Sequence, residues 1–351
     1  MMKARQRQIE IMARQHQAAD ATSHQHTMSQ SSQSIQPRSM TMGSTYDDIP
    51  ILEIQDWDHI SQNPSSGSTF DSACKDGPVS AIEEIVTAQP RTPAFLHRGL
   101  LIALQAGDIE TARYLLERGA PIARQTPEVI LKAPATQQIA LFELFTAHGW
   151  TLNTPGLYGA VLLPRVVNNI PLLSWFLAHG ANPNLGPQKD FHDRYGSSDT
   201  ESCIALESAA ARGSVDAVKM LLDAGARIQN GTPLHFAAGV CPPGTNPHAG
   251  RVKPSKGFDE DRIPVMRLLV ENGADVNYKV ETRHMNPQYA IVHAVMAGAI
   301  ERVKWLVKHG ADPSLKGNFG SAQSYASFWG EEMEKAIEEG LEKRDGAGVE
   351  P

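Results

Sequence analysis

Thirteen histidines and three cysteines give this sequence its most obvious capacity for metal chemistry. A zinc site needs several closely placed nitrogen or sulfur ligands, which are commonly supplied by paired cysteines or histidines. The three cysteines lie far apart and form no such pair: Cys74, Cys203 and Cys241. His24 and His26 offer only two ligands, and His192 and His248 could meet the cysteines only if two loops folded together. The spacing predicts no metal site and no disulfide framework, and the odd cysteine count favours a reducing compartment.

The short motifs that carry common enzymatic reactions are also missing. The sequence contains no GxSxG nucleophile elbow, no GxxxxGK phosphate loop and no HExxH zinc helix. A cluster of carboxylates stands at Asp259–Asp261, but acids are favoured electrostatically at the start of a helix. We therefore predict no catalytic residue, no cofactor and no enzyme activity. An enzyme site built from inserted loops remains an alternative without a motif to support it.

The elements that would position any site follow from an internal repeat. A glycine followed by an apolar residue recurs at Gly119, Gly149, Gly180, Gly225, Gly273 and Gly310, and a weaker copy precedes Gln89. Apolar residues stand four, seven and ten positions before each glycine, which places them on one stripe of a short helix. A second glycine, twelve residues earlier in several copies, would end a preceding helix. Each unit is thus predicted to be two helices joined by a tight turn, and stacked units would bury the stripes.

This pattern resembles the ankyrin repeat. Gly231–Ala238 reads GTPLHFAA, which is similar to the opening motif of that family, and Gly273–Asn277 reads GADVN, which resembles its turn. The resemblance covers residues 68–317. It implies an all-α, ankyrin-repeat α-solenoid of about seven repeats, with short hairpin-like fingers between successive repeats.

The resemblance also assigns roles within the GTPLH motif. Thr232 is expected to cap the first helix of its repeat, and Pro233 to occupy the first turn. His235 would hydrogen-bond within and between repeats, so a structural role is favoured over a catalytic one. Pro134 and Pro164 fall inside the first helices of two other repeats, which predicts that those repeats are distorted.

The chain outside the repeats differs in composition from the chain within them. Residues 1–45 are rich in Gln, Ser, Met, Thr and His and are predicted to be a disordered, low-complexity tail. Residues 46–67 mix acids with Ile, Leu and Trp; they are predicted to be a cap on the first repeat, with an acidic docking motif as the alternative. Residues 318–351 are predicted to form C-terminal capping helices and an acidic tail.

Three loops lengthen the repeats and carry the candidate partner-binding residues. Long loops are often functional, and aromatic side chains with Arg are typical anchors of protein interfaces. The first loop, 186–200, is expected between repeats; the second, 242–258, should separate the two helices of one repeat; the third is 277–286. The candidates in the first loop are Lys189, Phe191, His192, Arg194 and Tyr195. Those in the second and third loops are Arg251, Lys253, Lys256, Tyr278, Arg283 and His284.

Charge and hydropathy argue against two further classes of protein, nucleic-acid-binding proteins and membrane-spanning proteins. Residues 1–66 hold five Lys/Arg against seven Asp/Glu, and residues 331–351 hold three against eight, so these ends account for the net charge of −7. The repeats therefore lack the basic surplus of a nucleic-acid-binding body, and no run reaches the ~18 apolar residues of a membrane helix. We predict a monomeric, non-enzymatic adaptor that binds protein partners in the cytoplasm or nucleus. A nuclear transcription coregulator is the alternative, because the tail carries Lys3, Arg5, Arg7 and Arg14.

Overall fold

The structure is a computed structural model that describes residues 69–247, 250–281, 287–318 and 320–346. The predictions for residues 1–45 and 46–67 lie outside these residues, as do Arg283 and His284. The described residues fall into two compact units. Unit 2 contains the chain up to Leu206 together with Lys219–Gly231, and unit 1 contains Glu207–Val218 and the chain from Thr232 onward. The predicted all-α class is confirmed, because every named element of the described chain is a helix.

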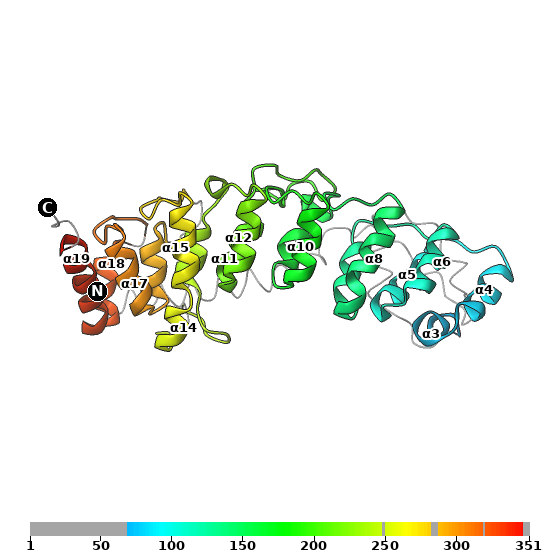
Figure 1. Ribbon diagram of the computed structural model, residues 1–351, viewed down its shortest axis with the longest axis horizontal. Helices are drawn as coiled ribbons and strands as arrows, with labels where there is room; N and C mark the ends of the chain where they lie inside the picture. The colour runs from blue at the N-terminus through cyan, green and yellow to red at the C-terminus, as the bar shows by residue number, and fades with distance from the viewer. Residues whose placement is uncertain (1–68, 248–249, 282–286, 319, 347–351) are drawn as a thin grey trace, which may run out of the picture. The chain divides into compact units, whose positions relative to one another are not determined.

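Unit 2 is built from helix pairs that follow one another in chain order (Figure 1). The pairs are α3 (Thr69–Asp76) with α4 (Val79–Thr87), α5 (Pro93–Ala106) with α6 (Ile109–Glu117), α7 (Thr126–Val129) with α8 (Ala135–Ala147), and α9 (Leu163–Val166) with α10 (Ile170–Ala178). Single 3₁₀ turns, η3 (Ile130–Lys132) and η4 (Leu157–Gly159), complete two of the pairs. First helices pack on first helices, as α3 does on α5, and second helices pack on second helices, as α6 does on α8.

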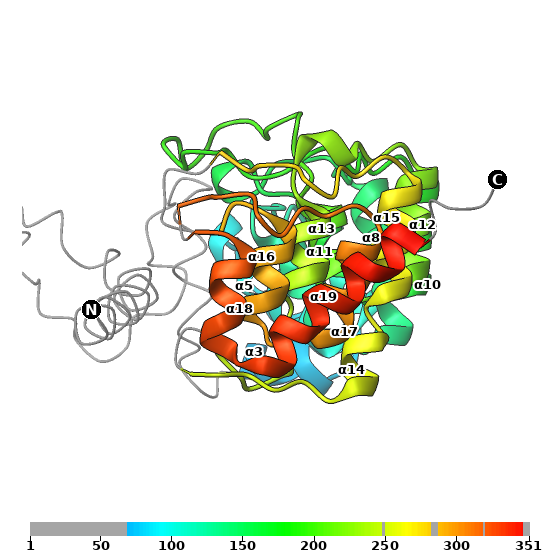
Figure 2. The same ribbon diagram turned by 90° about the vertical axis from the view of Figure 1, so that its left-hand side faces the viewer.

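Unit 1 repeats the same arrangement. Its helices are α13 (Pro233–Gly239), α14 (Lys256–Glu260), α15 (Ile263–Glu271), α16 (Ala290–Met296), α17 (Ile300–Lys308), α18 (Ala322–Trp329) and α19 (Glu331–Gly346). Two more helices, α11 (Ile204–Arg212) and α12 (Val215–Asp223), contribute residues to both units. Figure 2 looks onto α18 and α19, which pack on α16 and α17 respectively.

The recurring glycines end the second helices as predicted. Gly310 has a φ of 98°, a left-handed conformation that a residue with a Cβ adopts at a cost. The backbone N–H of Ala311 then donates to the Leu306 carbonyl oxygen at 2.9 Å, which satisfies an orphan carbonyl at the helix end. The other five repeat glycines also have positive φ.

The predicted apolar stripe is buried at two of its three positions. Residues four and seven before the glycine are fully buried in all six glycine-ended repeats; examples are Leu221, Phe142 and Phe145. In the weaker copy before Gln89, Ile82 is fully buried but Ile85 is only half-buried. The residue ten positions before the glycine is not part of the core. Val215, which occupies this position in its repeat, is 39% exposed. This position was predicted wrongly because in five of the repeats it is the first residue of the second helix, where the chain emerges from the turn.

Both proline-bearing repeats are distorted, as expected. Their first helices, α7 and α9, are only four residues long. Pro134 follows the 3₁₀ turn η3 and precedes α8, so the chain breaks there rather than continuing as one helix. Pro164 stands in the first turn of α9, a position that needs no backbone N–H.

The GTPLH motif behaves as expected at all but one position. Pro233 opens α13, Leu234 is buried, and His235 Nε2 lies 3.2 Å from the carbonyl oxygen of Gln288 in the next repeat. Thr232 does not cap α13 with its side chain. Its backbone N–H donates instead to Glu207 Oε1 at 2.7 Å, and burial raises the pKa of that carboxyl above its ordinary value.

Asparagine side chains join successive connections between repeats. The Asn277 side chain donates from Nδ2 to the Gly310 carbonyl at 2.9 Å, and its Oδ1 accepts from the Asp312 N–H at 2.8 Å. Asn153 and Asn184 make the same pair of bonds within unit 2. Each amide therefore satisfies two backbone groups at the end of the next repeat, which fixes the spacing of successive connections.

Candidate partner-binding surface

The first loop, 186–200, joins α10 to α11 and is held against the 3₁₀ turn η4. The backbone N–H of Tyr158 donates to the Arg194 carbonyl, and that of Gln188 donates to the Tyr158 carbonyl, both at 2.8 Å. The Ser198 hydroxyl donates to the Gly159 carbonyl at 2.6 Å. A Cβ on Gly159 would lie only 2.4 Å from a backbone oxygen of this loop, so the contact requires glycine. The loop is therefore a fixed part of unit 2.

An exposed aromatic residue stands on this fixed loop in a strained backbone conformation. The Phe191 side chain is 56% exposed, and its φ is 50°. Its ring meets the Tyr158 ring edge-on at 5.8 Å between centroids, and Tyr158 has a φ of 54°. Within the described part of the chain, no other residue except glycine has a positive φ. For bulky residues this conformation costs about 1–3 kcal/mol each.

Tyr195 is held between two cations and is only partly exposed. The guanidinium carbons of Arg124 and Arg194 lie 5.7 Å and 5.6 Å from the centre of its ring. Arg124 also donates to the Pro155 carbonyl at 3.2 Å. Tyr195 thus packs within the surface, and Phe191 is the more accessible aromatic of the loop.

The remaining polar candidates of the first loop pair with neighbouring carboxylates. Lys189 Nζ lies 3.5 Å from Asp199 Oδ2. His192 Nδ1 lies 2.6 Å from Asp190 Oδ1, and this hydrogen bond raises the pKa of the His192 imidazole above its ordinary value. Exposed pairs of this kind orient side chains but contribute little stability.

Much of the second loop, by contrast, is packed into unit 1. It separates α13 from α15, as predicted, and Val252 is only 5% exposed. The carbonyl oxygen of Val252 lies where a Cβ on Gly298 would be, so the loop crosses the turn of the next repeat in close contact. Arg251 donates to the Phe328 carbonyl, and its guanidinium lies 5.1 Å from the centre of the Phe328 ring. Arg251 therefore ties the loop to α18.

The two lysines of the second loop remain at the surface. Lys253 is exposed, and Lys256 Nζ lies 3.6 Å from Glu260 Oε1 in the same helix. These residues could contact a partner, but neither is held in a defined site.

A buried ion pair fixes the end of the second loop. Asp259 and Arg302 are both almost completely buried, with Asp259 Oδ1 2.5 Å from Arg302 Nε. Asp259 also accepts the backbone N–H of Glu301 at 2.5 Å, in the first turn of α17, and Arg302 donates to the Ala238 carbonyl at 2.6 Å. Asp259 lies in the first turn of α14, as expected for an acid at the start of a helix, and its carboxylate also caps α17 of the next repeat.

In the third loop, only Tyr278 among the three candidates is described. Its side chain is 46% exposed, and its ring meets the His235 ring edge-on at 6.2 Å. Arg251 contacts α18, whereas Tyr278 contacts α13. These two candidate partner-binding residues of unit 1 therefore pack on different helices.

Other accessible or supporting residues were not anticipated from the sequence. Phe236, on the first helix of its repeat, is 45% exposed; its place directly after His235 in the GTPLH motif could have identified it. Arg124 and Tyr158 support the first loop from positions at least 30 residues earlier in the chain. No local pattern marks such long-range contacts.

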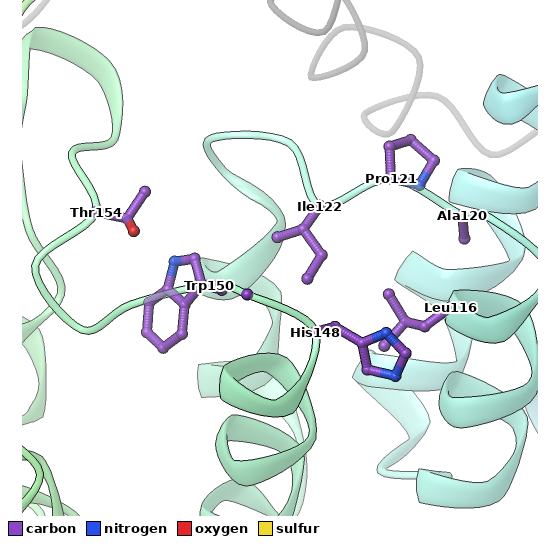
Figure 3. Close-up of a pocket in the computed structure, with 8 residues that line it drawn as sticks. Leu116, Ala120, Pro121, Ile122, His148, Trp150 and Thr154 are labelled. Atoms are coloured by element: carbon purple, nitrogen blue, oxygen red, sulfur yellow. The ribbon is translucent and has the colours of Figure 1, made fainter.

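Unit 2 also contains a hollow of about 450 Å³ between the ends of α6 and α8 (Figure 3). Its lining residues are Leu116, Ala120, Pro121, Ile122, His148, Gly149, Trp150 and Thr154. Trp150 stands where most other repeats have alanine after the glycine. Its indole stacks on Phe142, with ring centres 5.6 Å apart, and closes one side of the hollow.

The described residues offer little to metal or thiol chemistry. No three His, Cys, Asp or Glu side chains among them are placed to hold one metal ion. All three cysteines are free thiols, and burial raises the pKa of Cys74 to about 12. In the same part of the chain, no helix combines the length and hydropathy needed to cross a membrane.

No protein-family model and no curated protein matches the sequence. Among solved structures, the chain is similar to the human ASB11 ankyrin repeat domain, with 18% identity and a TM-score of 0.38 over 77% of this chain and 96% of that one. It is also similar to the ankyrin repeat domain of Bcl-3, with 18% identity and a TM-score of 0.38 over 75% and 88%. We take no function or partner from likenesses of this degree. The stacked helix pairs, the glycine-ended second helices and the asparagine links themselves give the described residues an ankyrin-repeat fold.

Proposed function

We propose that this protein is a non-enzymatic adaptor that holds a protein partner against its first loop. The observation that carries the proposal is Phe191, an exposed aromatic residue in a strained conformation on a loop fixed by hydrogen bonds. Strain is retained where the surrounding structure over-determines it, and such residues cluster at functional sites. Exposure of a phenyl ring to water offers no compensating gain in the free protein.

The surroundings of Phe191 suit an interface. Aromatic and Arg side chains dominate the energy of protein interfaces, and Tyr195 with its two flanking guanidiniums lies on the same loop and its support. A loop that is already ordered loses little conformational entropy when a partner binds. The paired charges of Lys189 and His192 would lie at the rim, where they would set orientation and association rate more than affinity.

In this proposal the adaptor acts as a monomer in the cytoplasm or nucleus. The three free thiols support a reducing compartment, since disulfides are rare there.

The test is quantitative affinity capture with the tagged full-length protein. Phe191→Ala is compared with wild type and with Phe236→Ala, which removes another exposed phenyl ring, from unit 1. Phe236 is 45% exposed and Phe191 56%. We expect at least one protein that wild type and Phe236→Ala recover equally to fall about tenfold with Phe191→Ala, the effect of losing an interface anchor worth ~1.4 kcal/mol. Identical recovery of every protein by all three would contradict the proposal.

A further inference from the structure

A strip of unit 2 joins the hollow to the first loop. The hollow is lined by Ile122 and Thr154 among others. Arg124 follows Ile122 by two residues, and its side chain donates to the carbonyl of Pro155, the residue after Thr154. Arg124 also lies against the Tyr195 ring of the first loop. The apolar side chains of the hollow, the two guanidiniums and the loop therefore form one surface, which we call the Arg124 strip.

The Arg124 strip presents two guanidiniums, those of Arg124 and Arg194, that form no ion pair with a described carboxylate. The acids of the first loop are engaged elsewhere: Asp190 with His192, Asp199 with Lys189, and Asp193 with the backbone N–H of Tyr195. A ligand with both carboxylates and large apolar side chains would complement this surface.

The chain itself contains such a segment just before the first helix. Residues 46–60 read YDDIPILEIQDWDHI, with five acids, no Lys or Arg, and Trp57 among several Ile and Leu residues. We propose that residues 46–60 dock on the Arg124 strip of their own chain, with apolar side chains in the hollow and carboxylates on Arg124 and Arg194.

The length of the chain allows this contact. Eight residues separate Ile60 from Thr69, the first residue of α3, and a chain of that length spans up to about 30 Å. The hollow lies between the second and third helix pairs, because its lining comes from the ends of α6 and α8. Neighbouring helices pack about 8–10 Å apart, so two layers of helices lie well within reach.

The consequence, but not the contact itself, rests on the proposed function. If the first loop binds a partner, residues 46–60 and the partner compete for the same surface. Docking can occur whether or not the first loop serves a partner, so it is measured separately.

The test places a photo-reactive cross-linker in the full-length protein, as Trp57→p-benzoylphenylalanine, and maps its products by mass spectrometry. We expect most cross-links within one chain on residues 116–124, 148–156 or 191–198, with a yield that does not change with protein concentration. Arg124→Gln combined with Arg194→Gln should lower that yield at least fivefold. The control, Arg113→Gln with Arg227→Gln, changes two exposed arginines elsewhere in unit 2 and should not lower it.

A second variant guards against misfolding of the arginine variant. Replacing the five acids of residues 46–60 by their amides alters no described residue and should lower the yield to the same extent. Cross-links confined to other regions, or a yield unaffected by either set of substitutions, would overturn the proposal. Cross-links that rise with concentration and join two chains would overturn it in favour of a second copy as the occupant. Loss of a partner on Phe191→Ala alongside such results would leave the proposed function standing.

Discussion

The first and second loops are both long insertions that carry Arg among polar residues, yet they relate to the repeats in opposite ways. The first loop rests on unit 2 through backbone hydrogen bonds and turns Phe191, 56% exposed, toward solvent. The second loop sends Val252 into unit 1, where it is 5% exposed, and is followed directly by Asp259, which is 2% exposed. The first loop exposes an aromatic side chain, whereas the second loop contributes to the core of unit 1.

This difference shows that loop length and composition do not identify a binding surface. Arg251 and Arg194 have the same side chain, and each stands in a long insertion, but Arg251 ties its loop to α18 through Phe328. Arg194 has no ion-pair partner among the described residues. The deciding feature of the second loop is a buried acid whose partner, Arg302, lies 43 residues further along the chain.

The largest expected effect is on the buried ion pair. Asp259→Ala leaves the Arg302 guanidinium buried without its carboxylate and removes the cap of α17, so the free energy of unfolding of the cooperative transition should fall by about 3–5 kcal/mol. Urea denaturation measures this loss. Asp261→Ala, an exposed neighbour, should cost less than about 0.5 kcal/mol. Equal losses for the two variants would mean that the second loop is not part of the core.

The next largest effect is expected at an ordinary apolar core residue, and it can be compared with the loss of stability at Asp259. Leu221 is fully buried, so Leu221→Ala should lower the free energy of unfolding by about 2–5 kcal/mol through the cavity it leaves. Val215→Ala, in the same helix but 39% exposed, should cost less than about 1 kcal/mol, because little apolar area is lost. A loss below about 1 kcal/mol for Leu221→Ala would remove that residue from the core.

The dependence of the free energy of unfolding on pH should differ between a buried and an exposed histidine. His97 is buried beside Thr126, 2.8 Å from its hydroxyl, and burial lowers the pKa of its imidazole to about 4. The unfolded chain binds this proton near pH 6.5, so stability should fall from pH 6.5 to pH 4, by roughly 2–3 kcal/mol in total. His97→Gln should flatten this part of the curve.

His192 in the first loop has a raised pKa, so any contribution it makes has the opposite sign. That contribution would be present below the unfolded pKa and lost as pH rises through the folded one. His192 is exposed, and His192→Gln should leave the curve unchanged. A curve that responds to His192→Gln but not to His97→Gln would contradict this assignment.

A smaller effect is expected where the second loop meets α18. Arg251→Ala removes an exposed cation–π contact and a hydrogen bond to the Phe328 carbonyl, so it should cost about 0.5–1 kcal/mol. Lys253→Ala serves as the control, because Lys253 is exposed on the same loop. Thermal unfolding of both variants checks the difference, and equal midpoints would place Arg251 among the free surface residues.

Patterns within one repeat were predictable because each depends on residues a few positions apart. The buried positions four and seven before each glycine, and the short first helices at Pro134 and Pro164, follow from helix periodicity and proline geometry. Thr232 was predicted wrongly because its hydroxyl is directed to the carboxylate of Glu207, from an earlier helix, at 3.4 Å, and makes no capping bond to α13.

The candidate site was predictable only as residue types on a loop. That Phe191 would be exposed and strained depends on its contact with Tyr158, 33 residues earlier. The support from Arg124 comes from even further away, because Arg124 precedes Tyr195 by 71 residues. Contacts between repeats have no periodic signature, because they join the irregular parts of the chain.

The central claim is that the first loop holds Phe191 in a strained conformation that favours contact over stability. The most direct test compares the free energy of unfolding of Phe191→Gly with that of Phe191→Ala. Glycine adopts a φ near 50° without steric cost, so we predict that the glycine variant is more stable than the alanine variant by about 1 kcal/mol. A glycine variant less stable than the alanine variant, as at an ordinary backbone position, would contradict the claim.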